Sequence, residues 1–248
     1  MTKLIYFGCL SGSRYKETCE NAAKIIKFLD DEYQVFDDPP CCGSLAHHVA
    51  GNDEIENHEK YVNEWFKEND ITELITICAG CYSYLTRYYP QNLGSAFNVK
   101  VQHLLQFLNQ PENLKKLNLK YGGKKLTVYY HDACHLRNAE VPIIEEARNI
   151  INSIAGPIDL KEMENNKMNS LCCGAGGGVY SIFKENSDYS SKIIFEQMRM
   201  SKALLTACPF CYTALKRIKE ENSKIKTPVI KFEDFILRLM EGVDPISV

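Results

Sequence analysis

The placement of cysteines constrains this chain more than any other feature of its sequence. Ten of its eleven cysteines form two sets of five, each ordered as a single Cys, a Cys-Cys-Gly triplet and a Cys-x-x-Cys pair. Two matched sets predict an internal duplication with one metal site in each half. Only Cys19 lies outside them, in a predicted helix where a small buried apolar residue is expected. The first set is Cys9, Cys41, Cys42, Cys78 and Cys81, and the second is Cys134, Cys172, Cys173, Cys208 and Cys211.

Several ordinary uses of cysteine fit this pattern poorly. The apolar run at the amino terminus is too short for a secretion signal, and no run is long enough to span a membrane. We therefore expect a cytoplasmic protein, in which structural disulfides are not sustained. An odd cysteine count also forbids complete pairing within one chain. The net charge of −3 without a basic cluster argues against nucleic-acid binding.

Metal binding by thiolates is the remaining interpretation, and it leaves two kinds of metal open. Zinc sites close with four ligands, so five thiols per half suit zinc poorly, although zinc in one or both halves stays an alternative. A thioredoxin-like site needs a single redox Cys-x-x-Cys. Iron–sulfur clusters use thiolates as standard ligands and fit best. Neither half has the compact cysteine run of a ferredoxin, so electrons should come from a partner.

Alternating apolar strands and amphipathic helices predict an α/β fold. The order recurs in both halves and implies two duplicated, Rossmann-like units with mostly parallel sheets, which we divide as residues 1–120 and 121–248. The segment Gln91–Gly123 is expected to connect them. Predicted strands end close before Cys9, Cys78, Cys134 and Cys208, which should therefore gather at the carboxyl edges of the sheets.

The sequence predicts bounds for the individual helices and strands. A helix from about Cys81 to Tyr88 should end at Pro90, because proline disfavours the helical conformation of the residue before it. Helices beginning after Cys78 and Cys208 should point N–H donors at an anionic cluster. Other predicted strands are Leu4–Phe7, Tyr33–Phe36, Leu74–Ile77, Leu126–Tyr130, Ile158–Leu160, Leu204–Ala207 and Val229–Phe232; other predicted helices are Tyr15–Leu29, Asp53–Asn69, Val141–Ile154, Ser190–Lys202, Phe210–Lys219 and Phe235–Met240.

Histidines near the cysteines are candidates for proton chemistry. His131 and His135 flank Cys134 and could hydrogen-bond cluster sulfur or give a proton to a departing thiolate, because imidazole titrates near neutrality. The alternative is that they cap or pack. His47 and His48 follow the first Cys-Cys-Gly and could line the same cavity.

The double motif resembles the cysteine-rich (CCG) domain family, whose members include the B-type component of heterodisulfide reductase. The likeness covers nearly the whole chain and is closest to the catalytic, carboxyl-terminal part of the D-type component. Three short segments support this resemblance: Tyr130–Leu136 (YHDACHL), Leu171–Gly178 (LCCGAGGG) and Thr206–Cys211 (TACPFC). All ten cysteines of the two motifs are present.

The resemblance implies a function that composition does not. It implies a non-cubane [4Fe-4S] cluster in each half, held by the five cysteines, or zinc in one half as in some related proteins. It further implies reduction of the disulfide of coenzymes M and B, with electrons from a ferredoxin-like C-type subunit and in some complexes a flavoprotein. The alternative is an electron-transfer or anchoring subunit of a succinate, fumarate, glycolate or lactate system, peripheral to a membrane complex.

Overall fold

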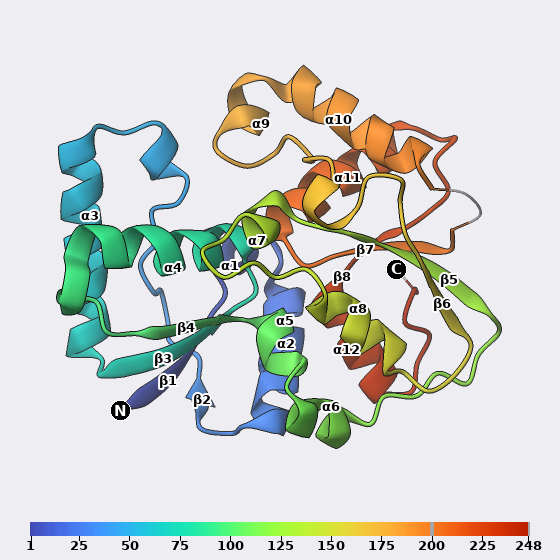
Figure 1. The fold of residues 1–248 in the computed structure, drawn as a ribbon, viewed down its shortest axis with the longest axis horizontal. Helices are drawn as coiled ribbons and strands as arrows, with labels where there is room; N and C mark the ends of the chain where they lie inside the picture. The colour runs from blue at the N-terminus through green and yellow to red at the C-terminus, as the bar shows by residue number, and fades with distance from the viewer. Residues whose placement is uncertain (199–200, 248) are drawn as a thin grey trace.

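A computed structural model describes residues 1–198 and 201–247 of the chain. Its first half alternates strands and helices, as expected (Figure 1). The elements of this half are β1 (Thr2–Tyr6), α1 (Cys9–Arg14), α2 (Lys16–Leu29), β2 (Tyr33–Gln34), η1 (Ala46–His48), α3 (Asn52–Glu68), β3 (Ile71–Thr76), α4 (Ala79–Leu93), η2 (Gly94–Ala96), β4 (Lys100–His103), α5 (Leu104–Leu108) and α6 (Pro111–Leu117).

The second half repeats the sequence of strands with different helices between them. Its elements are β5 (Leu126–His131), α7 (Cys134–Arg137), α8 (Glu146–Asn152), β6 (Ile158–Lys161), η3 (Lys167–Asn169), α9 (Val179–Ile182), α10 (Lys184–Glu196), β7 (Ala203–Thr206), α11 (Pro209–Glu221), β8 (Val229–Lys231) and α12 (Phe232–Met240).

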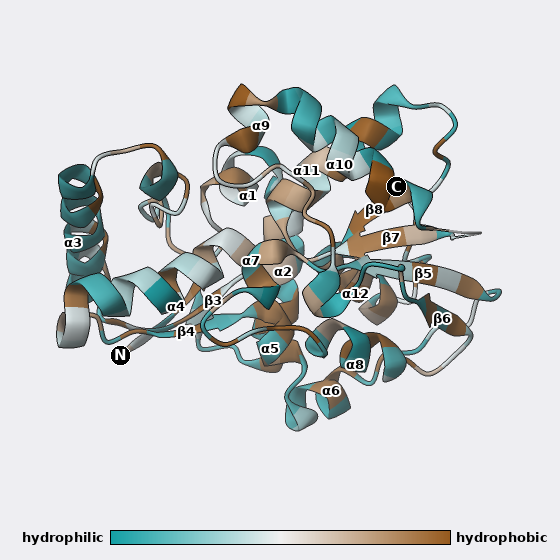
Figure 2. Ribbon diagram, turned by 45° about the horizontal axis from the view of Figure 1, so that its top comes forward, coloured by the Kyte–Doolittle hydropathy of each residue, from teal (hydrophilic) through white to brown (hydrophobic). Residues whose placement is uncertain are grey.

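Each half is built on one four-stranded sheet in which all described strand pairs are parallel. The strand orders are β2-β1-β3-β4 and β6-β5-β7-β8, so the second sheet repeats the first. This confirms the predicted α/β fold with two similar parallel-sheet halves. The central strands consist mainly of apolar residues because helices cover both of their faces. In Figure 2, β7 and β8 are largely hydrophobic, whereas α3 presents many hydrophilic residues.

Two predictions about the end of the first half are wrong. The segment Gln91–Gly123 is not a plain connector, because it contains β4, α5 and α6. Pro90 does not end the preceding helix, since α4 continues to Leu93. Contacts on both sides of the proline hold the helix together: the buried Tyr89 donates a hydrogen bond to the Cys42 carbonyl, and Asn92 donates one to Glu59. Tertiary packing thus outweighs the local effect of proline.

Two helices of the second half also differ from prediction. Val141–Ile154 is helical only over α8, since the Ile143 amide bonds instead to the carbonyl of Leu136. The helix predicted at Ser190–Lys202 lies earlier, as α10. Residues 199–200 of that predicted range lie outside the described residues.

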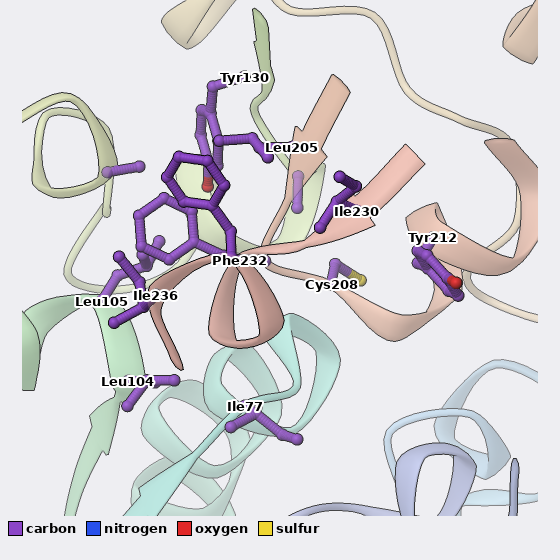
Figure 3. Packing of buried hydrophobic residues seen from close by; sticks show 14 of the residues in the cluster. Ile77, Leu104, Leu105, Tyr130, Leu205, Cys208, Tyr212, Ile230, Phe232 and Ile236 are labelled. Carbon is purple, nitrogen blue, oxygen red and sulfur yellow. The ribbon is translucent and has the colours of Figure 1, made fainter. Parts of the chain in front are cut away.

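The two halves share one hydrophobic core. Helix α12 of the second half packs along α2 of the first, and the two lie side by side in Figure 1. Figure 3 shows Phe232 and Ile236 of α12 near Leu104 and Leu105 of α5, with Ile77 beyond them. Because this core crosses between the sheets, a division of the chain at residues 120 and 121 stays a prediction.

A polar contact also crosses between the halves. Thr18 and Asn21 of α2 each donate a hydrogen bond of 3.0 Å to Asp234 of α12. The buried Lys231 amino group donates to Thr18 and lies 3.8 Å from the centroid of the Tyr15 ring. These contacts join the first half to the second beside the shared core. No helix in the described part of the chain is long and apolar enough to cross a membrane.

Candidate metal centres

Strand ends place the cysteines where the sequence predicts them. Cys9 and Cys78 follow β1 and β3, while Cys134 and Cys208 follow β5 and β7 at the corresponding edge of the second sheet. Cys78 and Cys208 are the N-cap residues of α4 and α11, and Pro209 occupies the first turn of α11. Both helices therefore direct free backbone N–H groups toward their cysteine set, an arrangement that favours negative charge.

The first set of thiols is gathered into one group. The Sγ atoms of Cys9 and Cys41 are 3.6 Å apart, and those of Cys42 and Cys81 are 3.2 Å apart. Further thiol–thiol hydrogen bonds join Cys41 to Cys42 and Cys81 to Cys78. All five thiols of the first half thus form one continuous chain of contacts.

The second set repeats this geometry. Cys134 and Cys172 have Sγ atoms 3.6 Å apart, and Cys173 and Cys211 have Sγ atoms 3.2 Å apart. Cys211 also interacts with Cys208. The duplication seen in the sequence therefore extends to the side-chain arrangement of the two sites.

Hydrogen bonds between the crowded thiols lower the pKa of the first cysteine of each Cys-Cys pair, and in the first half they also lower the pKa of Cys78. Hydrogen bonds with Cys42 and then Cys9 lower the pKa of Cys41 to about 2, while the bond to Cys41 and burial raise the pKa of Cys9. In the second half, bonds with Cys134 and then Cys173 lower the pKa of Cys172 to about 2. In both halves the first cysteine of the Cys-Cys pair thus lies beside a thiol whose pKa is raised and which keeps its proton, Cys9 in the first half and Cys134 in the second. A bound metal would replace those protons.

Small residues let the backbone approach the first set. A β-carbon on Gly8 would lie 2.9 Å from Cys81 Sγ, and Gly8 has φ = 77°, a conformation that favours glycine. Five thiols, free N–H groups and this close backbone approach together fit a thiolate-bound metal cluster.

The carbonyl of the buried member of each Cys-Cys pair is also held. In the first half Tyr89 donates a 3.0 Å hydrogen bond to the Cys42 carbonyl. In the second half Ser187 donates one of the same length to the Cys173 carbonyl, although it comes from a different helix. A side-chain hydrogen bond from the protein thus holds each Cys-Cys loop.

Two cavities open between the halves, beside the thiols. All five cysteines of the first set line one cavity, which has about 440 Å³ of empty space including its mouth, and His135 and Phe210 close it from the second half. Cys134 lines the other, of about 550 Å³ on the same measure, with Arg87 and Tyr88 from α4. His135 and Ser44 line both cavities. The two cavities are therefore neighbours with a shared wall, one bordered by all five thiols of the first set and the other by Cys134 of the second.

The predicted histidines have different surroundings. His135 has Nδ1 3.6 Å from Cys134 Sγ, and burial lowers its pKa. His48 lines the second cavity, as expected, whereas His47 packs on Tyr88, with ring centroids 4.2 Å apart. His131 lines neither cavity.

His131 lies behind the second thiol set. One of its ring nitrogens and the Sγ atoms of Cys173 and Cys211 lie within 4.8 Å of one another. The side chain is fully buried, and this burial lowers its pKa to about 4. The next residue, Asp132, is also buried and forms a two-pronged ion pair with Arg148.

Four residues of the site are not among those predicted from the sequence: Phe210, Arg87, Arg148 and Tyr6. Nothing local marks Arg87 and Arg148, because their contacts are made across the fold, whereas Phe210 stands inside the Cys-x-x-Cys motif of the second set. Tyr6 did carry a signal, since it stands three residues before Cys9 as His131 stands before Cys134.

Comparison with known proteins agrees with the double motif. Residues 4–86 and 128–216 each match the cysteine-rich domain family called CCG. The chain belongs to the CCG family. Its two matched segments contain one complete set of five cysteines each. Cys19, which lies outside the sets, is buried in the core as predicted.

Three relatives illustrate the range of CCG proteins that this chain resembles. It is 31% identical over 226 residues to an uncharacterized iron–sulfur protein of Methanocaldococcus jannaschii (88% of this chain, 42% of that one). It is 29% identical over 249 residues to the D-type component of dihydromethanophenazine:CoB–CoM heterodisulfide reductase from Methanosarcina acetivorans (97% and 59%). It is 30% identical over 219 residues to the B-type component of fumarate reductase (CoM/CoB) from Methanothermobacter marburgensis (88% and 42%). The chain thus spans about half the length of these relatives.

Proposed function

We propose that the two cysteine sets hold two iron–sulfur clusters of the non-cubane [4Fe-4S] type, one in each half. The fit of the residues supports this assignment: each half offers five converging thiols and a helix amino terminus directed at them. When bound, such clusters supply one-electron transfer at thiolate-ligated iron. Zinc in one half is the alternative occupant, because four of the five thiols could close a tetrahedral site.

We propose that the chain is an oxidoreductase subunit that reduces a disulfide, the CoM–CoB heterodisulfide or a similar one. Breaking the S–S bond takes two electrons and two protons and yields two thiols. The similarity to the D-type component of a heterodisulfide reductase supports this class of substrate. The observation that carries it is the pair of neighbouring cavities between the halves, which share Ser44 and His135 and border the first thiol set and Cys134.

Residues of the chain itself would position the disulfide. His135 lines both cavities, which supports a role in hydrogen-bonding a sulfur of the bound disulfide and in passing a proton to the thiolate that leaves. Arg87 brings a permanent positive charge to the second cavity, which favours an anionic substrate. The chain thus offers both a proton donor and a charge partner within the space that the substrate would occupy.

Electrons would arrive from a partner. We propose a ferredoxin-like, C-type iron–sulfur subunit as the direct donor, with a flavoprotein behind it, on the cytoplasmic side of a membrane complex. The chain has no ferredoxin-type cysteine run of its own, which supports a separate donor.

Metal analysis with a turnover assay tests the proposal. Chain purified without oxygen should carry about eight iron atoms if both halves hold four-iron clusters. It should reduce the heterodisulfide when supplied with a reduced viologen dye. About two zinc atoms without iron would contradict the cluster assignment, and about four iron atoms with one zinc would support the mixed centre.

A second function has its own support. The similarity to the B-type component of a fumarate reductase favours an electron-transfer role without disulfide chemistry. In that case the iron content is unchanged, but the reduced chain passes electrons to a dehydrogenase partner and leaves the heterodisulfide intact. The turnover assay therefore separates the two functions.

A further inference from the structure

Strand register makes Tyr6 and His131 equivalent residues of the two halves. Tyr6 ends β1 and pairs with Thr76 of β3, whereas His131 ends β5 and pairs with Thr206 of β7. Each residue stands three positions before the single cysteine of its set. The duplication that matches all ten thiols therefore places a phenol behind one set and an imidazole behind the other.

The phenol in the first half already has a hydrogen-bond partner. Tyr6 donates a 2.5 Å hydrogen bond to the carbonyl of Pro40, the residue before Cys41. The side chain thus holds the Cys-Cys-Gly loop, and its one donor is used. The corresponding carbonyl in the second half is that of Leu171, and His131 does not bond to it.

The imidazole in the second half has no such partner. Both ring nitrogens of His131 are buried without a hydrogen bond to any described residue. A buried polar atom left unpaired costs roughly 1–3 kcal/mol, so native proteins normally satisfy such atoms. One of these nitrogens lies within 4.8 Å of the Sγ atoms of Cys173 and Cys211. Since His131 lines neither cavity, a substrate in those cavities does not supply the missing partner.

The residue after His131 holds this strand end in place. Asp132 accepts hydrogen bonds of 2.7 and 2.9 Å from Arg148, and a third of 2.8 Å from the amide of Lys167. The equivalent residue of the first half is Phe7, which cannot form such a network. The buried Asp132–Arg148 ion pair therefore holds the residue next to the imidazole and so positions the imidazole. The first half has no equivalent ion pair at Phe7.

We propose that an N–H of His131 donates a hydrogen bond to a sulfur of the metal centre in the second half, and that the two centres are therefore inequivalent. This inference rests on the proposed cluster assignment. Imidazole carries at least one N–H in either protonation state. Hydrogen bonds to cluster sulfurs stabilise the more negative, reduced cluster and raise its reduction potential. The second centre consequently receives a hydrogen bond from His131 at the end of β5, and this bond favours reduction of that centre. The first centre receives no such bond from Tyr6, whose hydroxyl donates to Pro40.

Pulsed electron paramagnetic resonance on the full chain tests the hydrogen bond directly. The chain is labelled with ¹⁵N-histidine, and Cys42→Ala leaves only the second centre intact. His135 also touches Cys134, so the experiment uses a His135→Leu background. We expect a histidine nitrogen coupling in this reduced protein and its loss on adding His131→Leu. Absence of the coupling in the His135→Leu background, where His131 is still present, would overturn the inference without relying on the His131 variant to fold.

Redox titration of the two centres supplies the second measurement. His131→Leu should lower the midpoint potential of the second centre and leave that of the first unchanged. Tyr6→Phe is the matched control and should leave the potential of the second centre unchanged, since the Tyr6 hydroxyl bonds to Pro40 in the first half. An unchanged second potential in His131→Leu contradicts the proposal.

The outcomes separate this inference from the proposed function. A nitrogen coupling in a chain that does not reduce disulfides would leave the inference standing and overturn the function. Rapid disulfide reduction without that coupling would leave the proposed function standing and overturn the inference about His131.

Discussion

Gly8 lies so close to Cys81 that a single added methyl group would meet the sulfur at 2.9 Å. Gly8 also has φ = 77°, whereas its counterpart Ala133 in the second half has φ = −64°. The approach of strand β1 to its thiol set therefore depends on glycine in one half only, even though the thiol distances agree.

Gly8→Ala should damage the first centre selectively. The substitution combines a backbone conformation open essentially to glycine alone (φ = 77°, ψ = 157°), at roughly 1–3 kcal/mol, with displacement of a thiol. We expect roughly half of the iron to be lost, measured by metal analysis together with the cluster spectrum. The matched control is Ala133→Gly, which should retain its iron because glycine tolerates φ = −64°. Full iron content in Gly8→Ala would contradict the close approach.

Replacing one buried cysteine in each half tests whether the centres act jointly. Cys42→Ala and Cys173→Ala should each remove the spectrum of one centre and keep the other. If both centres act on one bound disulfide, either change should abolish two-electron turnover, because removing one member of a joint unit costs nearly as much as removing all of it. A variant that has lost one spectrum yet turns over at the wild-type rate would end the idea of joint action.

The Asp132–Arg148 pair makes a prediction about stability. Arg148→Ala leaves the Asp132 carboxylate buried without a positively charged partner. We therefore expect the free energy of unfolding to fall by about 3–5 kcal/mol. Urea denaturation monitored by circular dichroism measures it. Lys125 forms an exposed pair with Asp159, so Lys125→Ala should change stability by no more than about 1 kcal/mol. Equal effects of the two substitutions would contradict the importance of burial.

We expect the buried His103 to make the stability of the folded chain depend on pH. Burial lowers the pKa of His103 from 6.5 to about 3. Between these values the unfolded chain binds a proton that the folded chain does not, so stability falls as the pH drops below 6.5. The His103 contribution lost by pH ~5 is about 2 kcal/mol. His103→Asn removes the titrating group and supplies an amide oxygen that can cap α5 by accepting from the Leu105 amide, as His103 Nδ1 does.

Urea titrations near neutral pH and at about pH 5 on the metal-free chain check this dependence. The quantity to compare is the change in unfolding free energy between the two pH values, since the substitution also alters packing. That change should be smaller in His103→Asn than in the wild type. The same loss in both proteins would show that His103 is not buried in its neutral form.

The candidate site was predictable to an unusual extent because its parts are local in sequence. A strand that runs into a cysteine, and a helix that begins just after it, are read from a few neighbouring residues, as at Cys78 and Cys208. Duplication then supplied a second, independent copy of the same pattern. The missed strand β4 could have been found in this way, since its counterpart Val229–Phe232 was predicted from its apolar residues.

The sequence by itself determined the α/β halves, the cysteine sets and their places at the strand ends, because strand periodicity and thiol chemistry depend on short segments. Tertiary structure alone decided what faces those thiols. The continuation of α4 through Pro90, the shared core of α2 and α12, and the closure of the first cavity by His135 and Phe210 all join residues far apart in the chain. Local patterns do not encode such contacts, because they depend on how two complete sheets pack against each other.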